Sequence, residues 1–283
     1  MLNTLLRKFR TLLEFAQTGF HLGSNLRSRC SLAWMLPRFK WGLKRWNLNS
    51  RKFVVNIRLG RKPQLLHLRP PDIFILNEIH RGDPYWMPQL CADPPRRIVD
   101  LGAHIGLATL WLKRRLPAAE IHAYEPCAES FHLLSLNTRF HPGIFLHQAA
   151  VGEKAGVSML HVYEDSPASN SLVTDKPEAR KRKVACRVFT LDEILETAGG
   201  AVDLVKFDVE GIETPAFSRS RRIQQVPYII GEMKASQTRV LEFLRLFPDH
   251  RHECKRVTRS TSMIYLWAGS RTEALERELT SVS

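Results

Sequence analysis

Residues 97–107 read RIVDLGAHIGL, a short apolar run followed by two glycines. The apolar run predicts a buried strand, and the apolar spacing from Ile105 to Leu116 predicts a helix. Gly102 allows a tight turn between them, and Gly106 allows close packing where the helix begins. Because the first N–H groups of a helix have no partner inside it, this strand, turn and helix are typical of a ligand-binding site.

The glycine spacing excludes two common ligands of such a turn. A dinucleotide fingerprint requires G-x-G-x-x-G, but His104 and Leu107 occupy the second and third glycine positions. A P-loop requires Gly-Lys-Ser/Thr, which does not follow. A nucleoside without a bridging phosphate remains, and S-adenosylmethionine (SAM) has that form. Asp100, at the end of the strand, suits the cationic amino-acid group of SAM.

A second carboxylate follows the next expected strand, Ile121 to Tyr124. Glu125 lies nineteen residues beyond Gly106, where a carboxylate at a strand end can accept hydrogen bonds from both ribose hydroxyls. The glycine turn and Glu125 thus both indicate a nucleoside-binding site. The predicted SAM-binding residues are Asp100, Gly102, Ala103, His104, Gly106 and Glu125.

Residues 204–213 read LVKFDVEGIE, in which charged residues interrupt an apolar strand. Lys206, Asp208 and Glu210 are two apart, so the pleat of a strand is expected to place them on one face. Burying ionisable groups is costly unless they are paired or functional, and ligands bind at the carboxyl ends of strands in open α/β sheets. We interpret the three as active-site residues. A buried ion pair between Lys206 and a neighbouring carboxylate is the alternative.

The next expected strand, Val226 to Gly231, delivers Glu232 to the same edge of the sheet. Asp208 and Glu232 could then face one cleft. Two carboxylates there could hold a divalent cation, or one could act as a general base toward a hydroxyl, and the sequence leaves both open. The predicted catalytic residues are Lys206, Asp208, Glu210 and Glu232.

Strands and helices alternate along most of the chain, which predicts an α/β fold with a parallel sheet. Apolar runs predict strands at 98–101, 121–124, 144–151, 157–163, 184–189, 202–209 and 226–231, and helices at 105–116, 128–140 and 239–246. Thr190 and Glu193 form a capping box that opens a helix to about Thr197. Hairpins are expected from 53–59 with 65–68, before the core, and from 252–257 with 262–267, at its end.

The positive charge is concentrated at the start of the chain. Residues 1–69 contain fifteen Lys and Arg against Glu14, so this quarter carries the whole net charge of +14. Residues 2–20 have the apolar spacing of an amphipathic helix, and three tryptophans follow before residue 50. Contact of residues 1–70 with an anionic membrane surface or with nucleic acid is one interpretation, and a helical extension packed on its own domain is the other.

The cysteine spacing and the apolar runs predict a cytoplasmic protein, with a peripheral membrane location as the alternative. The five cysteines are far apart and form no C-x-x-C pair, which favours reduced thiols, and no run is apolar enough for a membrane span. Arg7, Lys8 and Arg10 stand where a signal peptide would be apolar. We expect a basic extension at 1–50, a small β/helical cap at 51–95, the catalytic domain at 96–270 and a tail at 271–283.

Four segments in this order resemble the FkbM family of SAM-dependent methyltransferases: residues 98–106, Tyr124-Glu125-Pro126, Thr190-Leu191-Asp192 and the Lys-x-Asp-x-Glu-Gly run at 206–211. The resemblance runs from roughly Asp72 to Trp267. It implies a doubly wound, seven-stranded, Rossmann-like class I methyltransferase sheet with an antiparallel C-terminal hairpin. It also implies that Ser169-Asn170-Ser171 corresponds to a serine-rich loop near the cleft. His104 departs from the family, which usually has asparagine there.

The function expected from the resemblance is SAM-dependent methylation of a hydroxyl on a sugar, polyketide or similar small molecule or glycan. Two alternatives depend on the basic first seventy residues. One is an RNA methyltransferase, and the other is a non-catalytic protein of the same fold that binds a membrane or partners.

Overall fold

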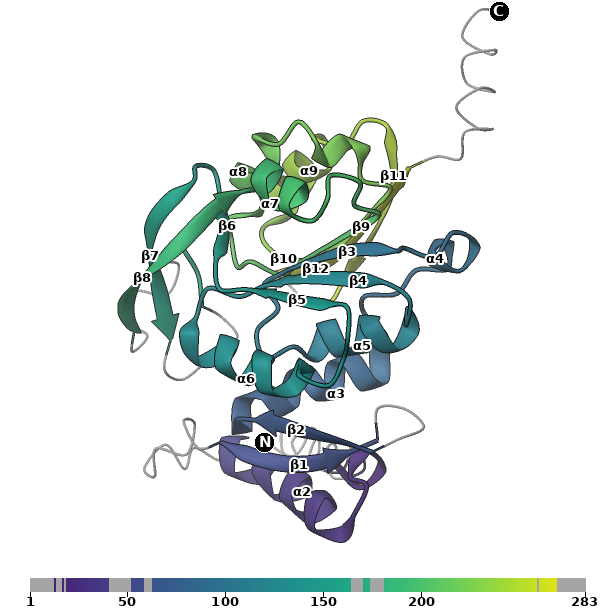
Figure 1. The fold of residues 1–283 in the computed structure, drawn as a ribbon, viewed down its shortest axis with the longest axis vertical. Coiled ribbons are helices and arrows are strands. Elements are labelled where there is room, and N and C mark those ends of the chain that lie inside the picture. The colour runs from purple at the N-terminus through teal and green to yellow at the C-terminus, as the bar shows by residue number, and fades with distance from the viewer. Residues whose placement is uncertain are drawn as a thin grey trace, which may run out of the picture.

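The fold is built on a seven-stranded mixed sheet with the strand order β11-β12-β10-β9-β3-β4-β5 (Figure 1). The computed structural model describes residues 13, 17, 19–40, 52–58, 63–163, 170–173, 181–258 and 260–268. The parallel strands are β3 (Arg97–Leu101), β4 (Glu120–Tyr124), β5 (Ile144–His147), β9 (Leu204–Phe207) and β10 (Tyr228–Lys234). The antiparallel strands β12 (Thr261–Ala268) and β11 (His250–Arg256) complete the sheet. The predicted doubly wound sheet with its C-terminal hairpin is confirmed.

Helices cover both faces of this sheet. On one face lie α3 (Ile73–Gly82), α5 (Leu107–Arg115) and α6 (Ala128–Thr138), and on the other lie α7 (Leu191–Thr197), α8 (Glu213–Ser218) and α9 (Gln237–Leu244). Short helices α4 (Gln89–Ala92), η3 (Pro70–Asp72) and η5 (Ile223–Gln225) lie in the connections. Alternate residues of β3 enter the two cores, since Ile98 packs with α5 and Val99 packs with α7.

The helix ends follow from local sequence. Thr190 accepts a hydrogen bond from the Glu193 N–H, and the Glu193 carboxylate accepts one from the Thr190 N–H, so the predicted capping box is present. Ser236 caps α9 in a similar way by accepting from the Arg239 N–H. These caps fix where α7 and α9 begin.

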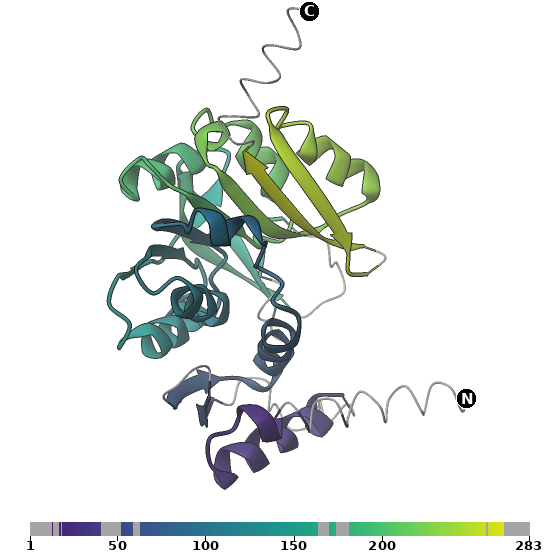
Figure 2. The ribbon, with the colours of Figure 1, turned by 90° about the vertical axis from the view of Figure 1, so that its right-hand side faces the viewer.

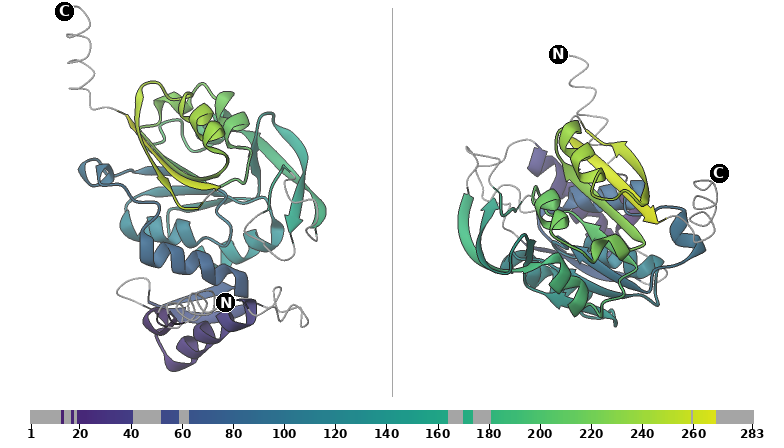
Figure 3. Two further views of the ribbon diagram at one scale, coloured as in Figure 1. Left: turned by 180° about the vertical axis from the view of Figure 1, so that it is seen from behind. Right: turned by 90° about the horizontal axis from the view of Figure 1, so that it is seen from above.

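One predicted strand is wrong, because residues 144–151 form two strands in different sheets. The Ala149 N–H donates to the His147 carbonyl, a tight turn that takes the chain out of the large sheet after β5. The next strand, β6 (Ala150–Gly152), belongs to a three-stranded sheet with β8 (Lys181–Thr190) and β7 (Gly156–Tyr163). Figure 3 shows the β7–β8 hairpin projecting from the side of the molecule.

An N-terminal unit packs against the helices below the sheet. It consists of α2 (Leu26–Lys40) and the predicted hairpin of β1 (Phe53–Ile57) and β2 (Gln64–Leu68). Figure 2 shows this unit at the opposite end of the molecule from β11 and β12. Among its buried side chains are Leu32, Ile57 and Leu66.

Several predictions fall largely or wholly on segments outside the described residues. They are the amphipathic helix at 2–20, Trp41 and Trp46, and the tail at 271–283. Within the described part of the chain, no helix has the length and apolar character needed to cross a membrane.

Candidate active site

An open cavity lies where β3, β4 and β9 end, with about 790 Å³ of empty space when the part open to solvent is included. This is the edge of the sheet at which open α/β folds bind ligands. The residues of its wall that carry chemistry are Tyr85, Gly102, His104, Glu125, Lys206 and Asp208. The structure thus brings residues from the predicted cofactor and catalytic sets to one cavity.

The glycine loop between β3 and α5 needs glycine at two positions. Gly102 has φ +78°, and a Cβ there would lie 2.0 Å from the Asp208 carbonyl oxygen. Gly106 precedes α5 with φ +86°, and its Cβ would lie 2.7 Å from Leu134 Cδ1. A side chain at Gly102 would push the loop away from the segment after β9, and at Gly106 the left-handed backbone would strain any side chain. Ala103, between them, is buried and also lines the cavity.

Asp100 and Lys206 form a buried ion pair beneath this loop. Lys206 Nζ lies 2.9 Å from Asp100 Oδ1 and donates a 3.1 Å hydrogen bond to the Gly102 carbonyl. Thr109 Oγ1 donates to Asp100 Oδ2 at 2.6 Å. The ion pair considered as the alternative for Lys206 is therefore present. Lys206 still lines the cavity, whereas Asp100 is not part of its wall.

Glu125 supports the loop from the end of β4. Its Oε2 accepts the His104 N–H at 2.9 Å, and its Oε1 accepts the Cys127 N–H at 2.8 Å. Burial raises the pKa of Glu125 to about 7, against the opposing effect of these two hydrogen bonds. Each carboxyl oxygen keeps a second acceptor position, so Glu125 can also bind hydroxyls of a ligand in the cavity.

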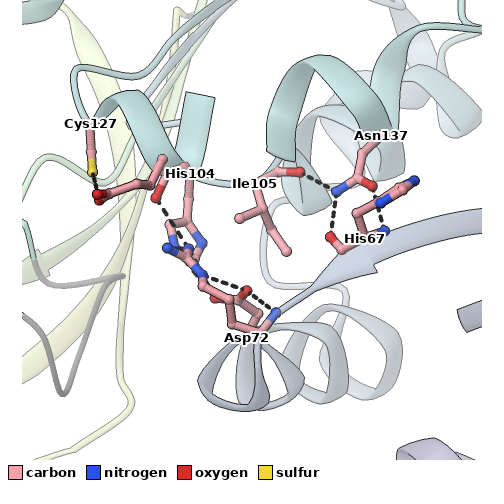
Figure 4. A network of polar contacts seen from close by, with 9 residues as sticks. His67, Asp72, His104, Ile105, Cys127 and Asn137 are labelled. Carbon is pink, nitrogen blue, oxygen red and sulfur yellow. Dashed lines mark hydrogen bonds and ion pairs between the residues drawn. The ribbon is translucent and has the colours of Figure 1, made fainter. Parts of the chain in front are cut away.

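His104 is contacted from outside the loop by Arg69. Asp72 also lies beside its ring (Figure 4). Arg69 Nη2 lies 2.7 Å from His104 Nε2 and donates to Ser130 Oγ at 3.1 Å. The Asp72 carboxylate accepts hydrogen bonds from the side chain and backbone N–H of Arg69. Burial is the main reason that the pKa of His104 falls to about 4.

No sequence pattern was used to predict Arg69 and Asp72 as site residues. Both are buried, although Arg and Asp are seldom buried unless they are paired. The available signal was their spacing of three residues around Pro70-Pro71, directly after an apolar strand.

The sequence predicts that Lys206, Asp208 and Glu210 share one face of a strand, and this prediction is wrong beyond Phe207. The strand ends at Phe207, and Asp208 lies in the cavity wall. Glu210 has φ +55° and pairs with Lys234 instead. The left-handed backbone at Glu210 rotates its side chain out of the strand alternation. Glu213, 2% exposed, accepts the Gly211 N–H at 3.0 Å and holds this loop.

Glu232 lies directly after the pairing of Gly231 with Phe207, at the same edge of the sheet. Burial and the nearby Asp208 carboxylate raise the pKa of Glu232 to about 8, although Lys234 lies 3.7 Å away. Glu232 is close to Asp208 but is not part of the cavity wall. Within the described residues, no group of three or more His, Cys, Asp or Glu could hold a metal ion.

Two further wall segments come from other parts of the chain. Asn170 and Ser171 line the cavity, and the Ser171 hydroxyl donates to the Glu210 carbonyl. Ser169 lies outside the described residues. Tyr85 follows α3 with its ring centroid 5.3 Å from Lys206 Nζ, and Ile75 of α3 also lines the cavity. No sequence pattern indicated Tyr85 or Ile75, since only the folded chain brings them to the same cavity as Lys206.

Comparison with known proteins identifies the family. The profile described as the methyltransferase FkbM domain matches residues 100–255, more than half of the chain. The chain belongs to this family. The FkbM methyltransferases are SAM-dependent, in agreement with the resemblance found in the sequence. Arg69, Asp72 and Tyr85 precede the matched FkbM domain.

Named relatives are methyltransferases. The methyltransferase sdnD of Sordaria araneosa is 34% identical over 48% of this chain and 52% of its own length. The 31-O-demethyl-FK506 methyltransferase FkbM of Streptomyces tacrolimicus is 27% identical over 49% and 53%. The chain thus spans about half the length of the curated relatives it matches. Among solved structures, Aeropyrum pernix fibrillarin with bound SAM has a TM-score of 0.38 and 14% identity, over 60% of this chain and 66% of that one.

The cavity of this FkbM domain suits SAM in the charges of its wall. Glu125 and Asp208 are acidic, and Lys206 is paired with Asp100, so the wall favours a cationic ligand over a pyrophosphate. SAM carries a sulfonium and an ammonium group. His104 Nδ1 is buried without a hydrogen-bond partner among the described residues, which a bound ligand can satisfy. The residues present therefore fit the cofactor of the family.

Proposed function

We propose that this protein transfers a methyl group from SAM to a hydroxyl oxygen of a small molecule or glycan. The observation that carries the proposal is the position of Asp208. Asp208 lies in the wall of the same cavity as the glycine loop and Glu125, next to apolar residues that can hold an acceptor. The name of the Streptomyces tacrolimicus relative supports oxygen as the methylated atom.

Asp208 is the group we assign to the acceptor. A hydroxyl becomes a better nucleophile when a carboxylate within hydrogen-bond reach accepts its proton, and this role requires a carboxylate at the cavity surface. Asp208 is part of the cavity wall, whereas Glu210 is paired with Lys234 and neither Glu210 nor Glu232 lines the cavity. Bound SAM supplies a methyl group activated by the positive sulfur. No protein-bound intermediate is needed, so the protein contributes mainly alignment.

Lys206 and Glu125 act on the cofactor side. Lys206 binds the Gly102 carbonyl while it is paired with Asp100, so it fixes the turn that holds the nucleoside. Glu125 accepts ribose hydroxyls with the acceptor positions that the His104 and Cys127 N–H groups leave free. Both residues thereby place the reacting methyl group against the acceptor oxygen.

Residues from two separate segments select the acceptor. Ile75 and Tyr85 form one side of the cavity, and Leu160 and Leu172 form another near the β7–β8 hairpin. These apolar and aromatic side chains suit a small organic acceptor or a sugar ring. Tyr85 and Ile75 precede the matched FkbM domain, so acceptor choice depends in part on a segment outside the matched residues.

Calorimetry with SAM and a methyl-transfer assay test the proposal together. Wild type is expected to bind SAM, Glu125→Ala to bind it at least about tenfold more weakly, and Asp208→Asn to bind it while losing transfer. Glu129→Gln is the matched control, because Glu129 is an exposed carboxylate four residues from Glu125 that pairs with Arg182. Absence of SAM binding in wild type, or unchanged binding in Glu125→Ala, overturns the cofactor assignment.

The acceptor class is tested with labelled SAM. Wild type is incubated with separate pools of metabolites, glycans and RNA, and the products are identified by mass spectrometry. Label on a hydroxyl of a metabolite or glycan supports the proposal. Label on RNA that disappears when residues 1–50 are deleted supports the RNA alternative, and no label in any pool supports a non-catalytic protein.

A further inference from the structure

The contact between Arg69 and His104 joins the N-terminal unit to the cofactor loop. Arg69 follows β2 and precedes the matched FkbM domain, and its Nη2 lies 2.7 Å from His104 Nε2. An arginine side chain only donates hydrogen bonds, so Nε2 must be the acceptor in this contact. A neutral imidazole that accepts at Nε2 carries its proton on Nδ1.

The surroundings of the ring keep it neutral. The charged or titratable groups around it are Asp72 and Arg69 on one side, Lys206 from β9, and Glu125, which accepts the backbone N–H of His104. Burial, Arg69 and Lys206 lower the pKa of His104, and only Asp72 acts in the opposite direction. Asp72 Oδ1 also lies 3.5 Å from His104 Nε2, but Arg69 Nη2 is nearer to Nε2 and itself donates to Asp72 Oδ1 at 3.3 Å, while Arg69 Nε donates to Asp72 Oδ2.

The proton on Nδ1 has no acceptor among the described residues. Nδ1 of His104 is buried and lacks a hydrogen-bond partner there, although the residue lines the cavity. The acidic wall residues Glu125 and Asp208 suit the cationic and hydroxyl groups of a ligand, but they repel an anionic one. A buried N–H donor supplies what an anionic ligand group requires. The carboxylate is the anionic group of SAM.

We propose that Arg69 is a positioning residue that holds His104 in the Nδ1–H tautomer, so that His104 donates a hydrogen bond to the carboxylate of bound SAM. Asp72 orients Arg69 for this contact. The inference rests on SAM being the cofactor, as proposed above. It connects the N-terminal unit to the cofactor site, because the residue that sets the tautomer directly follows β2 of that unit.

The tautomer can be measured without any ligand. Nitrogen NMR of the histidine side chains of wild type distinguishes Nδ1–H, Nε2–H and doubly protonated rings, and the signal missing in His104→Asn assigns His104. We expect the Nδ1–H form between pH 7 and pH 8. An Nε2–H tautomer or a cationic ring overturns the role of Arg69, whatever the protein binds.

The contact with the carboxylate is tested with two probes that share the nucleoside. S-adenosylhomocysteine carries the amino-acid carboxylate, and 5′-methylthioadenosine lacks it. In Arg69→Met at pH 8, Nε2 is free to carry the proton and donate to Asp72, so Nδ1 becomes an acceptor. Calorimetry should show that the affinity for S-adenosylhomocysteine falls about tenfold, the size expected for a hydrogen bond to a charged group. The affinity for methylthioadenosine should change little. Equal losses for both probes overturn the contact.

Two rescues separate this role from a merely structural one. In Arg69→Met, Asp72 acts on His104 without the opposing charge of Arg69, so lowering the pH from 8 to 5.5 increases the fraction of cationic ring. The cationic ring carries a proton on Nδ1, which raises the affinity for S-adenosylhomocysteine relative to methylthioadenosine. Protonation of Glu125 changes the affinity for both probes, so the ratio of the two affinities does not depend on it. In the double variant Arg69→Met/Asp72→Asn, the introduced amide can donate to Nε2 and restore the ratio at pH 8. Absence of both rescues overturns the proposal.

The outcomes also distinguish this inference from the proposed function. If wild type binds neither probe, the cofactor assignment fails, while the NMR experiment still decides the relation of Arg69 to His104. Arg69→Met leaves the buried Asp72 without its partner and could therefore fail to fold. In that case the test uses the double variant, which buries no charge at either position, together with the NMR spectrum of wild type.

Discussion

Lys206 Nζ lies 2.9 Å from Asp100 Oδ1, and the two side chains are 2% and 0% exposed. The residues are direct neighbours in the register of β3 and β9, so the pairing of two central strands brings the charges together. Because Lys206 also binds the Gly102 carbonyl, the ion pair connects the sheet to the cofactor loop. Removing either charge should therefore affect folding and cofactor binding together.

The first prediction concerns this ion pair. Lys206→Met leaves the Asp100 carboxylate buried without its countercharge, and breaking a buried pair in this way costs about 3–5 kcal/mol. The double variant Lys206→Met/Asp100→Asn removes both charges and should recover at least half of that loss. Urea unfolding of the three proteins measures the difference. The exposed pair of Arg182 and Glu129 is the control, and Arg182→Met should cost less than about 1 kcal/mol. Equal losses in both single variants would contradict the prediction.

The second prediction concerns the turn above the pair. In Gly102→Ala, the new Cβ meets the Asp208 carbonyl oxygen at 2.0 Å, and φ +78° strains any side chain, so β3 and β9 must separate. The expected loss exceeds about 3 kcal/mol, with loss of SAM binding. Gly82→Ala is the control, since nothing lies within 4 Å of its Cβ at the end of α3. It should change stability by less than about 1 kcal/mol, in the stabilising direction. Unfolding curves and calorimetry measure both variants, and a Gly102→Ala protein that behaves like the control would refute this role of the turn.

The sequence predicted the features that depend on local pattern. Apolar runs located the strands of the large sheet, two glycines located the cofactor turn, and the capping box located α7. Each depends on residues close together in the chain. The acidic residues after these strands reached the same edge for the same reason, because parallel strands end together. The cytoplasmic location and the contacts of residues 1–70 stay predictions.

Features that depend on contacts between distant segments could not be predicted from local sequence patterns. The sequence predicts that Asp100 contacts the ligand, and this stays a prediction. The pairing of Asp100 with Lys206 could not be predicted, because strand register sets the partner of a buried carboxylate. Glu210 was placed on a strand face, but the strand ends at Phe207 and the backbone turns left-handed. Arg69 reaches His104 only because the N-terminal unit packs beneath α6 and the loop.

The third prediction concerns how that unit is attached. Asn137 of α6 donates to the carbonyls of His67 and Ile105 and accepts the His67 N–H at 2.7 Å (Figure 4). Asn137→Ala leaves these buried backbone groups without partners, which costs about 1–3 kcal/mol. Hydrogen exchange should become faster in β2 and stay slow in β9. Ser135→Ala on the same helix removes only a local hydrogen bond and should leave β2 unchanged. Unchanged exchange of β2 in Asn137→Ala would show that other contacts hold the unit.

The last prediction concerns the pH dependence of stability and Glu213. Burial raises the pKa of this carboxyl from its ordinary value of 4.5 to about 7. Between these values the folded protein retains a proton that the unfolded chain has lost, so the free energy of unfolding falls as the pH rises from about 4.5 to 7. Glu213→Gln keeps an acceptor for the Gly211 N–H and removes the charge. Its stability should match wild type near pH 4 and exceed it by up to about 3 kcal/mol at pH 8. Glu196→Gln, at an exposed carboxylate of α7, is the control and should follow wild type at each pH. Urea unfolding at several pH values measures the three curves, and parallel curves for Glu213→Gln and wild type would mean that Glu213 is ionised in the folded protein throughout this range.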